Sequence, residues 1–272
     1  MPLLEVRDLA YTYPTGIPAL RGVSFAIDAG DVVGLLGPNG AGKSTLILHL
    51  NGILPGRGRV TVHGEPVGKT NLAQVRRTVG LVFQNPDDQL FMPTVFDDVA
   101  FGPLNLGLGE TEVRERVARA LEAVGMAGFE DRAPYHLSTG QKKRVALATV
   151  LVLDAEVLVL DEPTSGLDPR GRREFMNLLR ELPCAKLVAT HDLALAAELC
   201  SRVVILDAGV VVAQGPAGEI LSDAAKAGLI VSPPRCHPLP FLISRRPSRG
   251  RCPGAARKIT AVACSPSHTA LP

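Results

Sequence analysis

Tryptophan is absent from this sequence, and aromatic side chains make up only 4% of its 272 residues. Other apolar residues, chiefly Val, Leu and Ala, bring the hydrophobic fraction to 46%. This composition is typical of an α/β core and not of an aromatic-rich β-sandwich. The length allows one large domain or two small ones.

Long hydrophobic runs are also missing. No stretch approaches the roughly 18 apolar residues that a membrane-crossing helix needs. Residues 1–5 lack the charged-then-apolar order of a signal peptide. We therefore expect a soluble, cytosolic protein that reaches a membrane only through a partner.

Paired cysteines are lacking as well. The five cysteines show neither a CxxC pair nor the spacing of zinc ligands. A cytosolic location predicts reduced thiols with structural roles. These residues are Cys184, Cys200, Cys236, Cys252 and Cys264.

Acidic residues are absent from residue 233 onward, where seven basic residues and repeated prolines occur. Residues 1–232 hold the other 22 basic residues and all 27 acidic ones, a net charge of −5, which disfavours a nucleic-acid-binding body. We expect residues 1–232 to form the folded domain. Residues 233–272 should form a disordered, dispensable tail, because they cannot bury enough apolar surface to offset the entropy of ordering. The alternative is a basic arm that contacts anionic lipid.

The sequence does contain a complete phosphate-binding loop of the form GxxxxGK(S/T). The loop follows a strand-like run and precedes a helix-like run, as the motif requires, which disfavours a glycine-rich turn without nucleotide. In such loops backbone N–H groups surround the phosphates, Lys43 reaches the β- and γ-phosphates, and the Ser44 hydroxyl ligates Mg²⁺. The chain is therefore predicted to bind a nucleoside triphosphate. The loop comprises Gly37, Pro38, Asn39, Gly40, Ala41, Gly42, Lys43, Ser44 and Thr45.

Strand-like and helix-like segments alternate along most of the chain, which predicts a parallel α/β sheet. Thr111 is a suitable N-cap for a helix over residues 112–124, and Gly125 is placed to end that helix. Strands are predicted at residues 4–6, 23–27, 32–36, 59–62, 79–83, 157–160, 186–189 and 203–206, and further helices at 141–153 and 193–199.

Five further features follow the loop at informative spacings. Each alone has an ordinary interpretation, such as a solvated turn for a carboxylate pair or a helix cap for a histidine. Their occurrence together, in this order, is not expected by chance. They are Gln84 at a strand end, the run Leu137, Ser138, Thr139, Gly140 and Gln141, the pair Asp161 and Glu162, Asp168, and His191.

The run from Leu137 to Gln141, together with the phosphate loop, resembles the ATP-binding subunit of ABC transporters over about residues 3–225. The resemblance implies a P-loop ABC ATPase fold with a RecA-like parallel-sheet core, an N-terminal antiparallel β subdomain and a helical signature subdomain at about residues 85–155. It also implies an ATPase that couples hydrolysis to transmembrane transport, with ATP and Mg²⁺ as cofactors.

The resemblance gives the matching residues their expected roles. Tyr13 would stack on the adenine ring, with an ordinary strand-end tyrosine as the alternative. Asp161 would hold Mg²⁺ through water, whereas Glu162 would polarise the attacking water. Adjacent residues of an extended strand point to opposite sides, which allows this division of labour.

Three residues complete the expected catalytic and dimer groups. His191 would contact the γ-phosphate, Gln84 would sense Mg²⁺ and the nucleophile, and Asp168 would organise a dimer interface. Two subunits, expected to form a homodimer, would face head to tail, with the signature of one subunit covering the γ-phosphate held by the other.

Thr139 departs from the usual signature, which has glycine at this position. Backbone N–H donors survive the change, but a positive φ at a β-branched residue costs about 1–2 kcal/mol. We expect a modest handicap that does not abolish activity.

Within the family, residues 83–91 and 94–103, with the run Gln141-Lys142-Lys143-Arg144, resemble the ATPases of energy-coupling-factor importers, in particular those for cobalt and nickel. The resemblance implies a peripheral protein at the cytoplasmic face of the cell membrane. A transmembrane coupling subunit would dock beside the segment from Gln84 to Phe91, and a substrate-binding membrane subunit would select the solute. A vitamin importer is the alternative. Lys142 to Arg144 is interpreted as a solvated first turn of a helix.

The main rival function is a soluble ABC protein that acts on ribosomes or DNA. Ribosomal members carry two ATPase halves, and DNA-repair members separate loop and signature by a long coiled coil, whereas here 100 residues separate Gly37 from Leu137. A non-hydrolysing regulatory module is disfavoured because Glu162 and His191 are present. An import ATPase without a nucleic-acid partner is therefore the leading hypothesis.

Overall fold

The computed structural model describes the chain over residues 1–227, with side chains up to residue 222. The tail prediction for residues 233–272 and the three cysteines beyond Cys200 lie outside the described residues. Cys184 and Cys200 are both free thiols, as expected. Burial raises the pKa of the Cys200 thiol to about 12.

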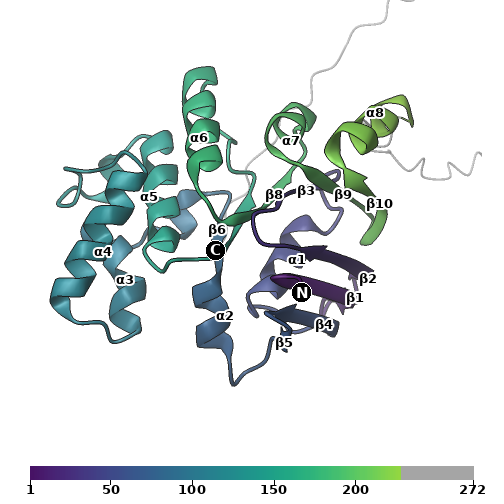
Figure 1. Cartoon of the computed structure of the whole chain (residues 1–272), viewed down its shortest axis with the longest axis horizontal. Coiled ribbons are helices and arrows are strands. Elements are labelled where there is room, and N and C mark those ends of the chain that lie inside the picture. The colour runs from purple at the N-terminus through teal and green to yellow at the C-terminus, as the bar shows by residue number, and fades with distance from the viewer. Residues whose placement is uncertain (228–272) are drawn as a thin grey trace, which may run out of the picture. The chain divides into compact units, whose positions relative to one another are not determined.

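A six-stranded, mostly parallel sheet carries the phosphate loop (Figure 1). Its strand order is β10-β9-β3-β8-β7-β6, and only the edge pair β10–β9 is antiparallel. Most of its strands read as continuous buried apolar runs, as strands covered on both faces do. The strands are β3 Val32–Leu36, β6 Val79–Val82, β7 Val157–Asp161, β8 Ala185–Thr190, β9 Arg202–Asp207 and β10 Val210–Pro216.

A second, four-stranded antiparallel sheet has the order β2-β1-β4-β5. β1 runs well beyond the predicted strand at residues 4–6, because Asp8 adopts a left-handed φ of 48° and shifts the register without ending the pairing. The strands are β1 Leu4–Thr12, β2 Pro18–Ile27, β4 Arg57–Val62 and β5 Glu65–Pro66.

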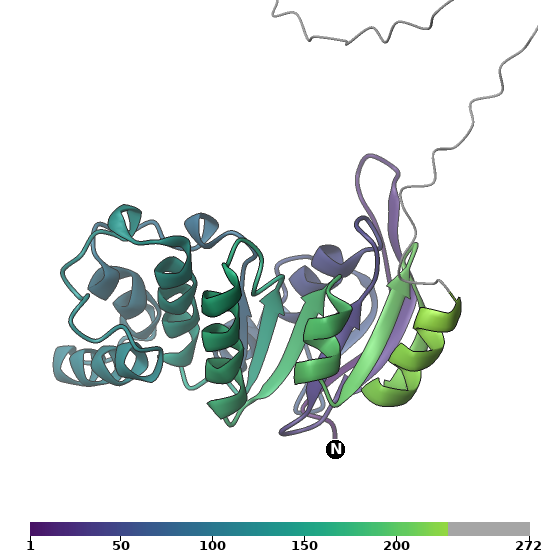
Figure 2. The same cartoon turned by 90° about the horizontal axis from the view of Figure 1, so that it is seen from above.

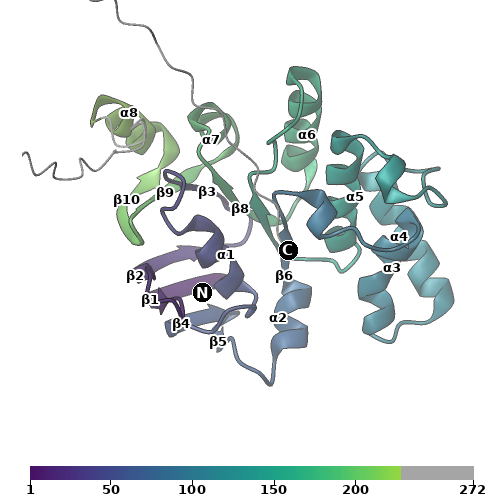
Figure 3. The same cartoon turned by 180° about the vertical axis from the view of Figure 1, so that it is seen from behind.

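The helices fall into groups that cover different faces of the parallel sheet. Helices α3, α4 and α5 pack on one another beyond strand β6 and form the helical part of the molecule (Figures 1 and 3). The helices are α1 Lys43–Leu50, α2 Leu72–Thr78, α3 Val95–Asn105, α4 Glu110–Ala123, α5 Thr139–Leu151, α6 Pro169–Glu181, α7 Leu193–Leu199 and α8 Ala217–Ala227, with short 3₁₀ turns η1 Pro86–Asp88 and η2 Pro134–His136.

Two hydrophobic clusters meet at the parallel sheet. One joins α1 and the antiparallel sheet to one face, and the other joins α3–α7 to the opposite face (Figure 2). Strand β7 shows the division, because Leu158 and Leu160 face the helical cluster, whereas Val157 and Val159 face the α1 cluster. The end of β7 is therefore held from both sides.

The predicted fold class is confirmed, with one correction in α4. Thr111 is not the N-cap, because α4 begins at Glu110 with Gly109 at the cap position. Glu110 and Glu112 both lie in the first turn, where negative charge is favourable at the positive end of the helix. Gly125 follows the helix end at φ 68°, as expected.

No helix among residues 1–227 is both long and apolar enough to cross a lipid bilayer.

Candidate active site

The phosphate loop connects β3 to α1 in a conformation that two glycines make possible. Gly37 has a φ of 154°, and a Cβ there would lie 2.1 Å from the Leu206 carbonyl oxygen. Gly42 has a φ of 105°, and its Cβ would lie 2.7 Å from the Ala19 carbonyl oxygen. The loop therefore packs against its neighbours at a distance that no side chain allows.

The loop borders a cavity of about 390 Å³. The cavity brings together Tyr13, part of the loop including Ser44, and the four other predicted catalytic or metal-binding residues. Its wall also includes Ile17 to Ala19, for which the sequence predicted no role. The lining residues are Tyr13, Ile17, Pro18, Ala19, Asn39, Gly40, Gly42, Lys43, Ser44, Thr45, Gln84, Asp161, Glu162 and His191.

Tyr13 lies at this cavity, and its hydroxyl is 2.8 Å from Thr45 Oγ1. Its ring contacts Tyr11 edge-on, with 5.0 Å between the ring centroids. The ring is therefore oriented from two sides, and its stacking on adenine stays a prediction.

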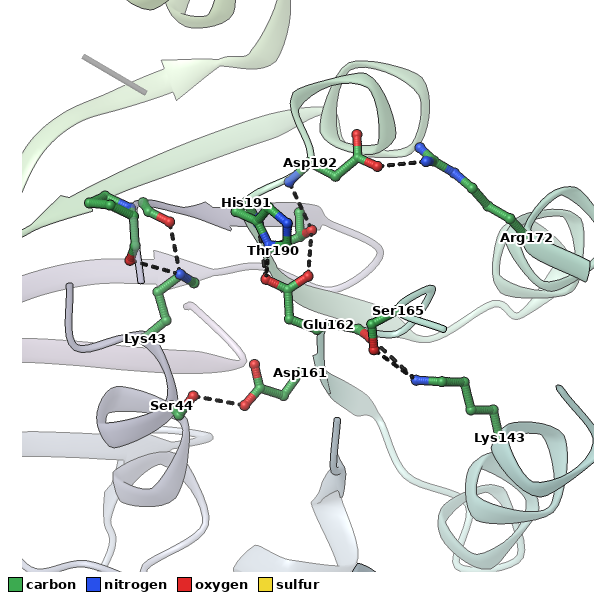
Figure 4. Close-up of polar contacts among 12 residues, drawn as sticks. Lys43, Ser44, Lys143, Asp161, Glu162, Ser165, Arg172, Thr190, His191 and Asp192 are labelled. Atoms are coloured by element: carbon green, nitrogen blue, oxygen red, sulfur yellow. Dashed lines mark hydrogen bonds and ion pairs between the residues drawn. The ribbon is translucent and has the colours of Figure 1, made fainter. Parts of the chain in front are cut away.

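Lys43 is folded over the loop. Its Nζ donates to the Gly37 and Pro38 carbonyl oxygens at 2.8 and 3.1 Å (Figure 4). Burial lowers the pKa of Lys43, and the negative charges of Glu162 and Asp161 oppose this effect. The ammonium group thus lies beside the cavity, where it can reach phosphate oxygens.

Ser44 and Asp161 meet across the same cavity. The Ser44 hydroxyl donates to Asp161 Oδ2 at 2.9 Å, and burial raises the pKa of Asp161 while this hydrogen bond acts in the opposite direction. A hydroxyl and a carboxylate are oxygen donors of the kind that Mg²⁺ prefers. The two residues therefore fit a magnesium site.

Glu162 follows directly on β7 and has an unusual backbone. Its φ is 43°, a left-handed conformation that costs a non-glycine residue about 1–2 kcal/mol. The side chain is fixed on both oxygens. Oε2 accepts a hydrogen bond from Thr190 Oγ1 at 3.1 Å, and Oε1 accepts from His191 Nδ1 at 2.7 Å and from the His191 backbone N–H at 3.1 Å (Figure 4).

These contacts separate the two adjacent carboxylates, since Asp161 faces Ser44 and Glu162 faces Thr190 and His191. A carboxylate only accepts, so the proton of His191 lies on Nδ1. Sequence reasoning missed Thr190, which is 1% exposed. Its position just before His191 at the end of β8 was the available signal.

A second prediction, that the run from Lys142 to Arg144 is a solvated helix turn, needs correction. Lys143 is 3% exposed, so the interpretation as a solvated turn was wrong for this residue. Its Nζ donates to backbone oxygens of Gln84 and Glu162, because α5 begins against the ends of β6 and β7. Burial lowers the pKa of Lys143. Lys142 pairs with Asp87 at 2.6 Å.

The signature residues lie at the start of α5 and border a different cavity, of about 440 Å³. Ser138 is the N-cap. Its side chain accepts from the Gln141 N–H at 3.3 Å, while the Gln141 side chain accepts from the Ser138 N–H at 2.9 Å. Thr139 is the first helical residue and has no positive φ, so the strain considered above does not arise.

Asp168 borders this second cavity too, where it caps α6 by accepting from the Gly171 N–H at 2.7 Å. The two cavities share no lining residue. The predicted site residues therefore form two separate groups in one chain, one around Lys43 and one around Ser138.

Comparisons with known proteins identify the family. Residues 20–165 match the family model of the ABC transporter. The energy-coupling factor transporter ATP-binding protein EcfA of Methanothermobacter thermautotrophicus is 53% identical over 228 residues, which cover 82% of this chain and 73% of the relative.

Two solved structures are similar in fold. The structure of cbiO1 from Clostridium perfringens, described as part of the ABC transporter complex cbiONQ, has a TM-score of 0.74 and 41% identity, covering 84% of this chain and 95% of that one. The ATP-binding cassette MJ0796, in a dimeric post-hydrolysis state with ADP and Pi, has a TM-score of 0.71 and 27% identity, covering 79% and 98%. The chain therefore belongs to the ABC transporter family, as an ATP-binding subunit with ATPase function.

Proposed function

We propose that this chain is the ATP-hydrolysing subunit of an energy-coupling-factor importer, with cobalt or nickel ions as the solute. The observation that carries the hydrolytic part is Glu162. Its carboxylate is fixed by Thr190 and His191 at the edge of the cavity that the phosphate loop borders.

The residues divide the reaction between them. Lys43 and the loop N–H groups bind the β- and γ-phosphates. Ser44 and Asp161 would hold Mg²⁺, which would neutralise phosphate charge. Glu162 accepts a proton from the water whose oxygen forms the new bond to the γ-phosphorus. The bond from that phosphorus to the β-phosphate oxygen breaks, and ADP and inorganic phosphate leave.

The separation of the two cavities supports a head-to-tail homodimer. Ser138 and its neighbours line a different cavity from the phosphate loop, so they do not face a nucleotide bound to the loop of their own chain. In a dimer they would cover the γ-phosphate bound by the partner, with Asp168 at the interface. The dimeric state of the related cassette MJ0796 is consistent with this arrangement.

An exposed apolar patch supports docking of a transmembrane coupling subunit beside residues 84–91. Phe91 is 66% exposed and packs edge-on against Phe101, which is 41% exposed. Leu104 extends the patch at 55% exposure. Contiguous exposed apolar surface of this kind marks an interaction site.

The segment that carries this patch is held in place from inside. Asp98 Oδ1 accepts the backbone N–H groups of Phe91 and Met92, both at 3.0 Å. Gln89 donates to the Ala146 carbonyl oxygen and to Thr149 Oγ1, at 2.9 and 2.8 Å. A partner that moves this segment would therefore also act on α5, the helix that begins at the signature.

Co-purification tests the membrane assignment. The chain is co-expressed with coupling and substrate-binding subunits of the energy-coupling-factor type, and the complex is isolated through a tag on the coupling subunit. Phe91→Asp should remove most of the bound ATPase, because it places a charge in the apolar patch. Ile53→Asp is the matched control, since Ile53 is 44% exposed but lies after α1, away from the patch.

Equal recovery of Phe91→Asp and wild type would contradict docking at this patch. Sedimentation of the wild-type chain with ribosomes instead of membranes would contradict the transport function. Uptake of radioactive cobalt or nickel by cells that express all three subunits tests the solute, and uptake of a vitamin instead would overturn the metal assignment.

A further inference from the structure

Lys143 is buried at a place where neither its charge nor its position in the helix favours burial. It is the fifth residue of α5, about one turn from the helix N-terminus, and is 3% exposed. A cation at a helix N-terminus opposes the helix dipole, and a buried ammonium group is costly unless its hydrogen bonds are satisfied. The first turn of α5 contains no acidic residue that would compensate.

The Lys143 side chain instead contacts two segments of the active site, and Figure 4 shows its contacts with the turn from Glu162 to Ser165. Its Nζ donates to the Gln84 carbonyl oxygen at 3.0 Å, to the Glu162 carbonyl oxygen at 3.3 Å and to Ser165 Oγ at 3.4 Å. An ammonium group has three N–H donors, so each donor has one acceptor. Gln84 follows β6, whereas Glu162 and Ser165 lie in one turn directly after β7.

The contact with Glu162 supports a backbone conformation of that residue that an extended strand does not adopt. Glu162 adopts a left-handed φ of 43°. Such a backbone persists only where its surroundings hold it. Thr190 and His191 fix the carboxylate end of Glu162. Its carbonyl oxygen accepts hydrogen bonds from Lys143 Nζ and from the Ser165 N–H group, the latter at 3.1 Å. Together these contacts set the direction in which the carboxylate points.

We propose that Lys143 is a positioning residue that ties the start of α5 to Glu162 and Gln84, so that ATP hydrolysis depends on it and ATP binding does not. The inference rests on the proposed role of Glu162 as the group that activates water. Lys143 does not line the nucleotide cavity, so its removal leaves the contacts to ATP in place.

Steady-state ATP hydrolysis by the full chain tests this proposal. Lys143→Met keeps the length of the side chain and removes its donors, and we expect kcat to fall between about 10-fold and 100-fold, as displacement of a catalytic group does. The dissociation constant of a fluorescent ATP analogue should stay within about three-fold of wild type. Lys143→Gln, whose amide still donates two hydrogen bonds, should recover part of the lost rate.

Lys186 provides a matched control. It is also 3% exposed, and its Nζ donates to the Leu182 and Cys184 carbonyl oxygens at 2.6 and 2.8 Å, at the opposite end of β8 from His191. Lys186→Met removes the same kind of buried contact without touching the active site. Its melting temperature should fall at least as far as that of Lys143→Met, whereas its kcat should stay within about two-fold of wild type.

A double variant distinguishes positioning from general damage. If Lys143 acts through Glu162, then Lys143→Met should not lower the residual rate of Glu162→Gln further. An equal loss in both backgrounds, a kcat of Lys143→Met within two-fold of wild type, or a parallel loss of ATP affinity would each overturn the proposal. Should Lys143→Met fail to fold, the same comparison is made with Lys143→Gln. Normal hydrolysis by Glu162→Gln would instead overturn the proposed function on which this inference rests.

Discussion

The phosphate loop and the signature both place a helix N-terminus beside a cavity, but the two helix ends are built differently. Gly42, the N-cap of α1, is left-handed and makes no side-chain cap, so the backbone N–H groups of that end remain available to an anion. Ser138, the N-cap of α5, forms a reciprocal capping box with Gln141. The signature residues thus provide hydrogen-bond acceptors for some of the backbone N–H groups at their own helix N-terminus.

The charges around the two ends differ in the same sense. The cavity at α1 brings Lys43 together with Asp161 and Glu162, all at least half buried. The cavity at α5 combines the uncharged residues from Ser138 to Gln141 with two arginines and two carboxylates, those of Arg144, Arg170, Asp168 and Glu174. The cavity at α1 therefore places a buried cation beside two carboxylates, whereas the helix N-terminus at the cavity of α5 carries only uncharged residues.

The largest expected effect comes from changing Glu162, a carboxylate at the cavity of α1. Glu162→Gln keeps the shape of the side chain but removes its capacity to accept a proton, so we expect ATP turnover to fall by about 10²–10⁴-fold. ATP binding should persist, and an ATP-bound dimer should accumulate. Hydrolysis is followed by phosphate release, and dimer formation by size-exclusion chromatography with ATP. A rate within a few-fold of wild type would show that Glu162 does not activate the water.

The next prediction tests whether the two helix ends act together across subunits. Ser138→Arg places bulk and charge at the signature, and Lys43→Ala removes the phosphate-binding ammonium group, so each variant alone should be inactive. In a mixture, some dimers contain one intact composite site, formed by the loop of the first variant and the signature of the second.

Hydrolysis by the mixture should therefore exceed the rates of both separate variants, and it should depend on their ratio. Mixing Ser138→Arg with Glu162→Gln is the matched control. If Glu162 acts together with the loop of its own chain, this mixed dimer also contains one intact site, with loop and Glu162 from the first variant and the signature from the second. Rescue should then equal that with Lys43→Ala. A mixture that stays as inactive as its components would contradict the head-to-tail dimer.

Local motifs made much of the active site predictable from sequence. The phosphate loop and the carboxylates after β7 depend on short runs whose order and periodicity are visible in the chain. The burial of Lys143 is different, because its acceptors Gln84 and Glu162 lie 59 and 19 residues away. Only the packing of α5 against the strand ends reveals them, and a run of three basic residues carries no such information.

Two further misses have a similar origin. Thr190 lies 28 residues from the Glu162 oxygen to which it donates, so the parallel pairing of β7 and β8 is needed to bring them together. The start of α4 was misplaced for a local reason, since Thr111 and Gly109 both suit an N-cap. With Gly109 as the cap, the negative charges of Glu110 and Glu112 both lie in the first turn, where they are favourable.

The smallest expected effect concerns Thr139, the departure from the usual signature glycine. The residue is exposed at the first position of α5, has an ordinary helical backbone and keeps its N–H group. Its side chain therefore causes no backbone strain and could affect hydrolysis by occupying space near the phosphate of a partner subunit. Thr139→Gly should change the free energy of unfolding by no more than about 0.5 kcal/mol, since the two residues differ little in helix propensity at such a position. We expect kcat to change by less than about three-fold. Thr139→Val, which keeps the shape and removes the hydroxyl, separates the two possible contributions. A ten-fold gain in Thr139→Gly alone would show that the side chain obstructs the composite site, whereas a ten-fold loss in both variants would show that the hydroxyl is itself a donor to the nucleotide.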